Sequence, residues 1–257
     1  MLVDSVNSDA DLLMPATSNP NKIATAIRTI LKKRGSAEHA KGVQWFFKEE
    51  VKSHGWYTAA LRAFARQQRR EILKEHDVEF LVQVADRLFT GRVLEEKIFA
   101  VLMLENLTRK LDERHFRLFE SWIDRISTWA DHDGLVHYLI APMIAADQKR
   151  LPRVFVWAKS ADRWHRRAAC VALIQGRQQR GYFAHTHRLS NSLLNDQDDM
   201  VQKGLGWLLR VTAKVDPEQT VPYLLSIRSR APRLVLRTAC ETLSPAQKKL
   251  VLAKTVQ

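Results

Sequence analysis

Cysteine, glycine and proline are all scarce in this chain of 257 residues, which has 2 Cys, 9 Gly and 8 Pro. Cys170 and Cys240 lie far apart, and neither stands in a CxxC motif or near a histidine pair at zinc-ligand spacing. This argues against a disulfide framework and against structural zinc. We expect both cysteines to be reduced residues of the core.

The chain also lacks an apolar run of membrane-spanning length, and its first residues carry acidic side chains where a signal peptide has basic ones. We therefore expect a cytoplasmic protein. Its 46% hydrophobic composition is enough to bury a core. We expect residues 1–20 to form a flexible leader and residues 21–257 to form a single domain.

The signals of β-hairpins are missing, because alternating apolar and polar runs flanked by turn dipeptides do not occur. Apolar residues recur at helical spacing instead, as Ile23, Ile27 and Leu31 do. We predict an all-α chain with helices at residues 19–34, 37–54, 58–70, 78–89, 93–109, 113–129, 134–146, 152–158, 162–175, 182–194, 200–214, 217–229 and 232–243.

Equivalent helices start roughly 35 to 45 residues apart per pair, without a strict sequence repeat. This spacing is typical of degenerate HEAT-like pairs stacked into a solenoid with a concave face, and a globular helix bundle is the alternative.

Positive charge is confined to the second half of the chain. Residues 149–257 contain 20 Lys+Arg and 7 Asp+Glu, whereas residues 1–148 contain 21 of each, so the whole formal charge of +13 lies in the second half. Such an asymmetry indicates a polyanionic partner, with nucleic acid the first candidate and an anionic membrane the second. A basic, merely solvated surface is the alternative.

The predicted helix at 200–214 has two distinct faces. Val201, Leu205 and Leu208 form its packing stripe. Another face carries, at i, i+4, i+7 and i+11, Lys203, Trp207, Arg210 and Lys214. An indole among cations suits a sugar or base held between phosphate contacts, and burial against the next repeat is the alternative.

Two glycines, Gly204 and Gly206, interrupt this helix, at a cost of roughly 1 kcal/mol each relative to alanine. We interpret them as sites of close approach by another helix or by a DNA backbone.

The helix at 162–175 carries a second basic cluster. Trp164, with Ala168 and Val171, is expected to pack. Three arginines then remain for solvent or for a phosphate ligand, namely Arg163, Arg166 and Arg167.

The stretch WADHDGLVH at 129–137 is expected to be an acidic, imidazole-rich bend that leads into a helix. Asp131, Asp133 and His137 are conceivable metal ligands, but no second paired ligand set accompanies them. We favour a site without metal, with Asp131 as a helix N-cap.

Five segments together resemble the AlkD-like DNA alkylation-repair family, bacterial DNA glycosylases built from HEAT-like repeats. The resemblance covers residues 37–243 and rests on AKGVQWFFKEEVKSHGWYTAALRAFAR (40–66), LEEKIFAVLML (94–104), WADHDGLVH (129–137), WHRRAACVAL (164–173) and MVQKGLGWLLRVTAKVDPEQTVPYL (200–224). The last segment fits the family pattern QKxxGWxLR followed by a lysine and a proline.

The resemblance implies removal of cationic 3-methyladenine-like and 7-methylguanine-like bases from duplex DNA, without flipping the base into a pocket, in contrast to most base-modifying enzymes. It implies no cofactor, and we expect a monomer that associates with the bacterial nucleoid when bound to DNA. The family site uses two tryptophans against the deoxyribose, an arginine on the backbone and an aspartate that stabilises the cationic sugar. Trp207 matches one tryptophan and Arg167 matches the arginine.

The family motif WDxVD is matched to residues 133–137, so Asp133 stands in the place of the second tryptophan and His137 in that of the aspartate. An imidazole supplies no negative charge, so we expect Asp133 to take over the catalytic role, with Asp131 a weaker substitute. The alternatives are a noncatalytic relative that binds damaged, bent or branched DNA, and a scaffold that binds an acidic protein.

Overall fold

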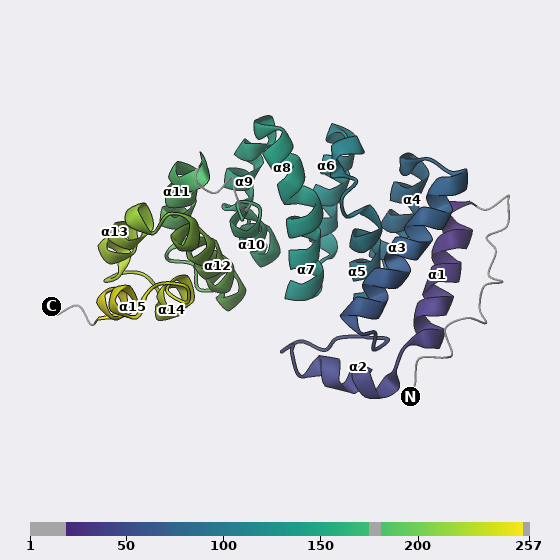
Figure 1. Cartoon of the computed structure of the whole chain (residues 1–257), viewed down its shortest axis with the longest axis horizontal. Coiled ribbons are helices and arrows are strands. Elements are labelled where there is room, and N and C mark those ends of the chain that lie inside the picture. The colour runs from purple at the N-terminus through teal and green to yellow at the C-terminus, as the bar shows by residue number, and fades with distance from the viewer. Residues whose placement is uncertain (1–18, 175–180, 254–257) are drawn as a thin grey trace. The chain divides into compact units, whose positions relative to one another are not determined.

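The computed structural model describes residues 19–174 and 181–253 and divides the chain into two compact units, residues 1–103 and 104–257 (Figure 1). The expected leader falls outside the described residues up to residue 18. Asn19 already caps the first helix, because its side chain accepts a hydrogen bond from Lys22 N at 3.0 Å. That residues 21–257 act as a single domain stays a prediction.

The first unit consists of five helices within its described part: α1 (Pro20–Arg34), α2 (Ala37–Gln44), α3 (Thr58–Glu75), α4 (Val78–Phe89) and α5 (Leu94–Leu104). Helix α4 packs against both α1 and α3. The predicted stripe of Ile23, Ile27 and Leu31 is buried on α1, as expected.

The helix predicted at 37–54 is shorter than expected, because α2 ends at Gln44. Two contacts of the Gln44 side chain replace further helical hydrogen bonds: Nε2 donates to the Glu49 carbonyl at 2.8 Å and Oε1 accepts from Val51 N at 2.9 Å. Phe46, just after the end of α2, is exposed. Side-chain bonds to the backbone have outweighed the helical periodicity here.

The second unit stacks its helices in two rows. One row is α7 (Trp129–Leu135), α10 (Arg163–Val171), α12 (Asp199–Val215) and α14 (Arg233–Ala239), where each helix packs on the next. The other helices are α6 (Glu113–Trp122), α8 (Ala141–Ala146), α9 (Leu151–Trp157), α11 (Phe183–Leu193), α13 (Pro217–Ile227) and α15 (Pro245–Leu252). Of these, α9, α11 and α13 form the second row against α10 and α12, and α15 packs on both α13 and α14. The prediction of an all-α helical-repeat fold is confirmed.

Helix α7 begins earlier than predicted. We expected one helix through Trp129 and a bend up to Gly134, but α6 ends at Trp122 and α7 starts at Trp129. Thr128 causes the restart, since its side chain caps α7 and its own N–H donates to Asp131 Oδ1 at 2.7 Å. The helix continues through a π-helical turn, Val136–Ile140, into α8.

Helix α15 was missed by the periodicity argument, although its start carries a capping box of Ser244 and Gln247 with Pro245 in the first turn. Cys170 and Cys240 are both buried, as expected. Burial raises the pKa of the Cys170 thiol to about 12, so this residue is an inert thiol of the core. Within the described parts of the chain, no helix has the length and apolarity needed to cross a membrane.

Candidate functional site

The centre of the candidate site is a two-pronged ion pair between α10 and α7. Arg167 Nε donates to Asp133 Oδ1 at 2.9 Å and Nη2 donates to Oδ2 at 2.7 Å. The remaining guanidinium nitrogen, Nη1, donates to the Met200 carbonyl at the start of α12, at 2.6 Å. Arg167 therefore ties three neighbouring helices together.

Arg167 is only 5% exposed, so of the two alternatives, solvent and a phosphate ligand, it does not face solvent. Sequence spacing does place it off the stripe of Trp164, Ala168 and Val171, all of which are buried. It is buried because α12 covers the other side of α10. A charge inside the protein persists when it is paired and hydrogen-bonded, and Asp133 and Met200 supply those partners.

A buried histidine supports Asp133 from the same helix. The ring nitrogens of His132 lie 2.8 Å from Asp133 Oδ1 and 3.0 Å from the Trp164 carbonyl oxygen. Because an ionised carboxylate only accepts hydrogen bonds, Nδ1 donates to Asp133 Oδ1. His132 thus fixes the carboxylate of Asp133 in place, and nothing in the sequence pattern had singled it out.

Asp133 is ionised in this setting. Burial alone raises the pKa of its carboxyl, but the hydrogen bond from His132 and the charge of Arg167 outweigh burial and hold the pKa below its ordinary value. The side chain keeps 19% of its surface exposed, so the negative charge is accessible from outside.

Trp207, half-buried on α12, approaches this ion pair through His137, four positions after Asp133, and the predicted stripe of Val201, Leu205 and Leu208 is fully buried. Its indole faces the ring of His137, with centroids 6.3 Å apart and planes 26° apart. The site therefore joins residues from α7, its π-helical turn, α10 and α12. We call Asp133, His137, Arg167 and Trp207 the Asp133 cluster.

The two glycines of α12 are explained by helix packing. A Cβ added at Gly204 would lie 3.2 Å from Arg167 Cγ, and one at Gly206 would lie 2.7 Å from Thr238 Cβ on α14. Of the two alternatives weighed, close approach by a helix is therefore the one the structure supports. Gly204 makes room for the arginine of the Asp133 cluster.

His137 is neutral in the cluster. Burial lowers the pKa of its imidazole, and the charges of Asp133 and Glu105 only partly oppose this effect. Its Nδ1 is buried without a hydrogen-bond partner. A neutral ring gives Trp207 an uncharged neighbour and supplies no negative charge to a reaction.

Asp131 has a structural role. It occupies the third position of α7 rather than the N-cap, so our N-cap assignment is wrong; Thr128 is the cap. The Asp131 carboxylate accepts from Ser127 N, Thr128 N and Thr128 Oγ1 at 2.6 to 3.0 Å. The described residues include no group of three His, Cys, Asp or Glu arranged to hold a metal ion.

Trp129 is a candidate that the sequence argument missed. It is the first residue of α7, four positions before Asp133, and is 36% exposed. Residues i and i+4 share a helix face. A tryptophan four residues before an aspartate is also the spacing in the WDxVD motif, and here that aspartate is the one bound to Arg167. The structure thus favours a motif register one helical turn earlier than residues 133–137.

The other predicted cations have protein partners or lie at the surface. Arg166 binds Asp196 Oδ2 at 2.6 Å and the carbonyls of Ser160 and Ala161, so it holds two connecting segments. Arg163 lies 3.7 Å from Asp198 and over the ring of Trp164.

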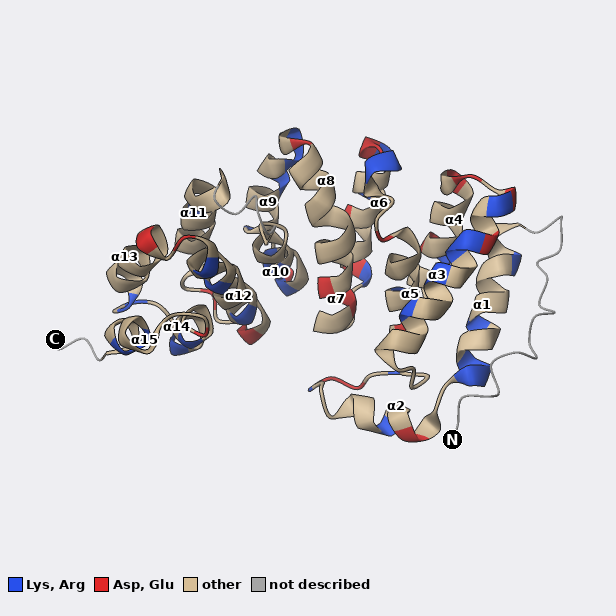
Figure 2. Cartoon of the chain, viewed as in Figure 1, with Lys and Arg blue, Asp and Glu red and all other residues tan. Residues whose placement is uncertain are grey.

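On α12, Lys203 contacts Asp199 at 3.3 Å and Arg210 pairs with Glu241, while Lys214 is exposed in the last turn. Lys and Arg gather on α10, α12 and α14 (Figure 2). The structure brings Arg167, Asp133, His137 and Trp207 together and leaves the remaining cations on the surrounding helices.

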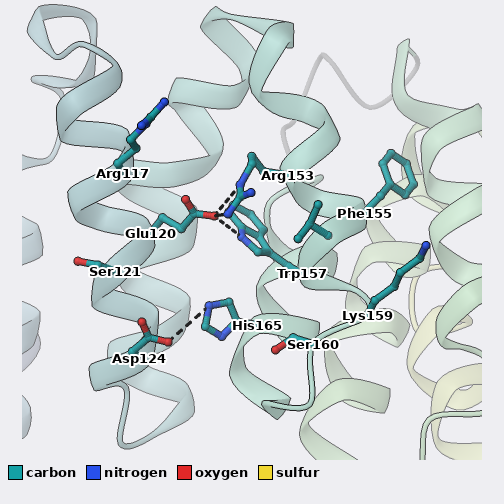
Figure 3. A pocket seen from close by; sticks show the side chains of 11 residues that line it. Arg117, Glu120, Ser121, Asp124, Arg153, Phe155, Trp157, Lys159, Ser160 and His165 are labelled. Carbon is teal, nitrogen blue, oxygen red and sulfur yellow. Dashed lines mark hydrogen bonds and ion pairs between the residues drawn. The ribbon is translucent and has the colours of Figure 1, made fainter.

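A separate pocket of about 780 Å³ lies on another side of α10, at its contact with α6 and α9 (Figure 3). Its charged side chains meet one another: Glu120 binds Arg153 and the indole of Trp157, and His165 lies 3.7 Å from Asp124. His165 is two positions from Arg167, about 200° around the helix. The pocket is therefore distinct from the Asp133 cluster.

The two-row stack makes this an all-α helical-repeat protein. Residues 27–243 match the sequence model of a family described as DNA alkylation repair enzyme. The chain belongs to this family. No curated protein matches it in sequence.

Three solved structures have a similar fold. A predicted DNA alkylation repair enzyme from Enterococcus faecalis aligns with a TM-score of 0.73 at 15% identity, over 82% of this chain and 97% of its own. AlkD2 from Streptococcus mutans aligns with a TM-score of 0.60 at 18% identity, over 86% of this chain and 99% of its own. The smu.31 protein of Streptococcus mutans UA159 aligns with a TM-score of 0.53 at 18% identity, over 72% of this chain and 100% of its own. At these low sequence identities, the three structures show only that the fold is shared.

Proposed function

We propose that this chain is a DNA glycosylase that hydrolyses the N-glycosidic bond of cationic N3- or N7-alkylated purines in duplex DNA, working as a monomer without a cofactor. Membership of the DNA alkylation repair family supports the substrate class. The observation that carries the proposal is the ionised, partly exposed Asp133, held by Arg167 beside Trp207.

The chemistry needs a negative charge and little else from the protein. When the C1′–N bond of an alkylated purine breaks, its electron pair passes to the cationic base, which leaves neutral, and positive charge moves onto the deoxyribose. A fixed carboxylate stabilises that charge because it is already oriented before the reaction. Water then adds to C1′, and its proton passes to the Asp133 carboxylate.

In this mechanism two tryptophan side chains also stabilise the cationic sugar. Trp129 and Trp207 would lie against the sugar, where the negative face of each ring attracts the developing cation. Arg167 and His132 act as positioning residues for Asp133 through the hydrogen bonds described above. His137, as a neutral ring beside Trp207, contributes packing rather than charge.

DNA affinity is assigned to the cations around the cluster. Lys203, Arg210 and Lys214 on α12 and Arg163 on α10 would contact phosphates, and binding should weaken steeply with salt because condensed counterions are released. Arg166 and Arg167 are less available, since both are held by acidic side chains and carbonyls.

A noncatalytic DNA-binding role is the second candidate, and one observation favours it. Both oxygens of Asp133 already accept hydrogen bonds from the positively charged Arg167, and Oδ1 also lies 2.8 Å from a ring nitrogen of His132. A carboxylate compensated in this way has less charge to offer a cationic sugar.

Excision of alkylated bases from methylated duplex DNA, compared with spontaneous depurination, tests the proposal. We expect excision by the wild type, its loss in Asp133→Asn with nearly unchanged DNA affinity, and partial activity in Asp133→Glu. Binding without excision in all three proteins would support the noncatalytic candidate. Excision that survives Asp133→Asn would remove Asp133 from the mechanism.

A further inference from the structure

Two large aromatic side chains of the first unit are almost fully exposed. Trp45 is 90% exposed and Phe46 is 73% exposed, directly after the end of α2. Apolar surface of this size in water is unfavourable by roughly 25 cal/mol per Å². Adjacent exposed rings therefore call for a ligand that covers them.

These rings are presented on a fixed turn. Gln44 spans it with hydrogen bonds from Nε2 to the Phe47 and Glu49 carbonyls, at 3.3 and 2.8 Å, and from Val51 N to Oε1. We call residues 44–52 the α2 turn. Because its backbone is held by side-chain bonds, the two rings lose little conformational freedom when they bind a ligand.

A buried carboxylate anchors the segment that follows. Glu95, at the start of α5, accepts hydrogen bonds from His54 N, Gly55 N and Trp56 N at 2.8, 2.9 and 3.3 Å, and from Ser53 Oγ at 2.5 Å. Gly55 has φ 77° and no room for a Cβ, which would lie 1.9 Å from the Ser36 carbonyl. The α2 turn therefore projects from a fixed base.

The charge around the α2 turn is positive. Residues 1–103 contain 16 Lys+Arg and 13 Asp+Glu, and residues 32–52 alone contain 6 and 3, so this short stretch holds the whole excess of the first unit. Lys32, Lys33 and Lys41 are exposed on α1 and α2. Within the α2 turn Lys48 and Lys52 are balanced by Glu49 and Glu50, and the nearest cation on α2 is Lys41, one helical turn before Trp45. A cation one turn from two exposed rings is complementary to an anionic chain that also offers planar apolar faces.

We propose that Trp45 and Phe46 stack on unpaired bases of DNA while the exposed lysines of α1 and α2 hold phosphates. The inference rests on DNA as the partner in the proposed function, but not on the glycosylase chemistry. Base stacking on aromatic side chains tolerates any sequence, because every base has a π face. Intact duplex hides those faces, so the contact requires a gap, a bulge or a displaced strand.

Other partners fit the α2 turn less well. An interfacial membrane helix needs an apolar face, and α2 has no buried residue and a mostly polar sequence, AEHAKGVQ. Protein interfaces are depleted in lysine at their centre, whereas the exposed Lys41 lies one helical turn before Trp45. Nucleic acid accommodates both features.

The experiment measures binding of the full chain to three lesion-free probes: intact duplex, the same duplex with a two-nucleotide gap, and a single strand. We expect tighter binding to the gapped and single-stranded probes. Trp45→Ala and Phe46→Ala should each weaken that binding roughly tenfold and leave intact-duplex binding unchanged, with Trp45→Phe close to wild type. Leu250→Ala, another exposed apolar side chain, is the matched control.

Indole fluorescence gives a second readout, since stacking on a base quenches tryptophan emission and the change should be lost in Trp45→Phe. Equal affinities of wild type and Trp45→Ala for the gapped duplex would overturn the inference, and so would binding to anionic phosphatidylserine vesicles that depends on Trp45 while DNA binding does not. If the wild type does not excise alkylated bases but Trp45→Ala still weakens binding to the gapped duplex, only the proposed glycosylase activity is refuted. Absence of DNA binding in the wild type would refute both.

Discussion

Arg167 and Asp133 face each other as parallel forks, with Nε to Oδ1 at 2.9 Å and Nη2 to Oδ2 at 2.7 Å. This geometry fixes both side chains, because a planar guanidinium and a planar carboxylate match at only a few orientations. The pair joins α10 to α7, and the Met200 contact extends it to α12. It is thus a structural link and the centre of the candidate site.

Removing the arginine should destabilise the fold. We expect Arg167→Ala to lower the free energy of unfolding by roughly 3 kcal/mol, because it leaves the Asp133 carboxylate and the Met200 carbonyl without their donor. Urea unfolding measures this, with Arg163→Ala, a partly exposed arginine of the same helix, as the control. If Arg167→Ala and Arg163→Ala lower the free energy of unfolding equally, the Arg167–Asp133 ion pair adds nothing to stability.

Asp133→Asn should lower the free energy of unfolding less in the Arg167→Ala variant than in the wild type. Once the arginine is gone, the carboxylate is a buried charge supported by His132 alone, so its neutralisation removes an unfavourable term. A double-mutant cycle on urea-unfolding free energies measures the coupling, which we expect to be at least about 1 kcal/mol. Additive effects would contradict a direct interaction between the two side chains.

The glycines of α12 should differ in their tolerance of a methyl group. Gly206→Ala should destabilise the protein by more than about 1 kcal/mol, since its Cβ would lie 2.7 Å from Thr238 Cβ, an atom that no rotamer moves away. Gly204→Ala should cost less stability, because its Cβ would lie 3.2 Å from Arg167 Cγ, a tight contact but a longer one than that at Gly206. Gly134→Ala, with open space around its Cβ, should stabilise by about 0.4–1 kcal/mol. Thermal unfolding of the three variants tests this order.

Most of the fold follows from local periodicity, as in α4, α11 and α12, whose predicted and observed bounds agree closely. The failures share a cause. At Gln44 and at Thr128, one polar side chain bonds to the backbone and ends or restarts a helix, and hydrophobic spacing does not record such bonds.

The wrongly predicted start of α7 also affected the prediction of the site residues. Because residues 129–133 were treated as a bend, the i, i+4 relation of Trp129 and Asp133 was not considered, although S/T-x-x-D at Thr128–Asp131 is a visible helix-start signal. The burial of Arg167 and the orientation of the His132 ring were beyond sequence reasoning, since the contacts of Arg167 with Asp133 and of His132 with Trp164 join residues more than 30 positions apart.

His137 should make stability depend on pH. Its pKa in the folded protein lies below the ordinary value, so the unfolded chain binds more protons in the interval between the folded pKa and about 6.5. The neutral ring's contribution is therefore fully present above that interval and is lost as the pH falls through it. Urea unfolding over a pH series should show a shallower acid loss in His137→Gln than in the wild type. Equal slopes would mean that His137 does not contribute.

Trp129 provides the sharpest test of the site, because it distinguishes the two registers of the motif. If Trp129 and Asp133 are the functional pair, Trp129→Ala should reduce excision roughly five- to thirtyfold, the effect of losing an aromatic face worth about 1–2 kcal/mol to a cation. Because the indole is 36% exposed and otherwise packed, urea unfolding must show that Trp129→Ala stays folded in the assay, and Trp129→Phe should retain part of the rate. The control is Val156→Ala, an exposed residue of the separate pocket. If excision instead is indifferent to Trp129→Ala and rises in His137→Asp, the aspartate position belongs to residue 137, and Asp133 serves only to hold Arg167.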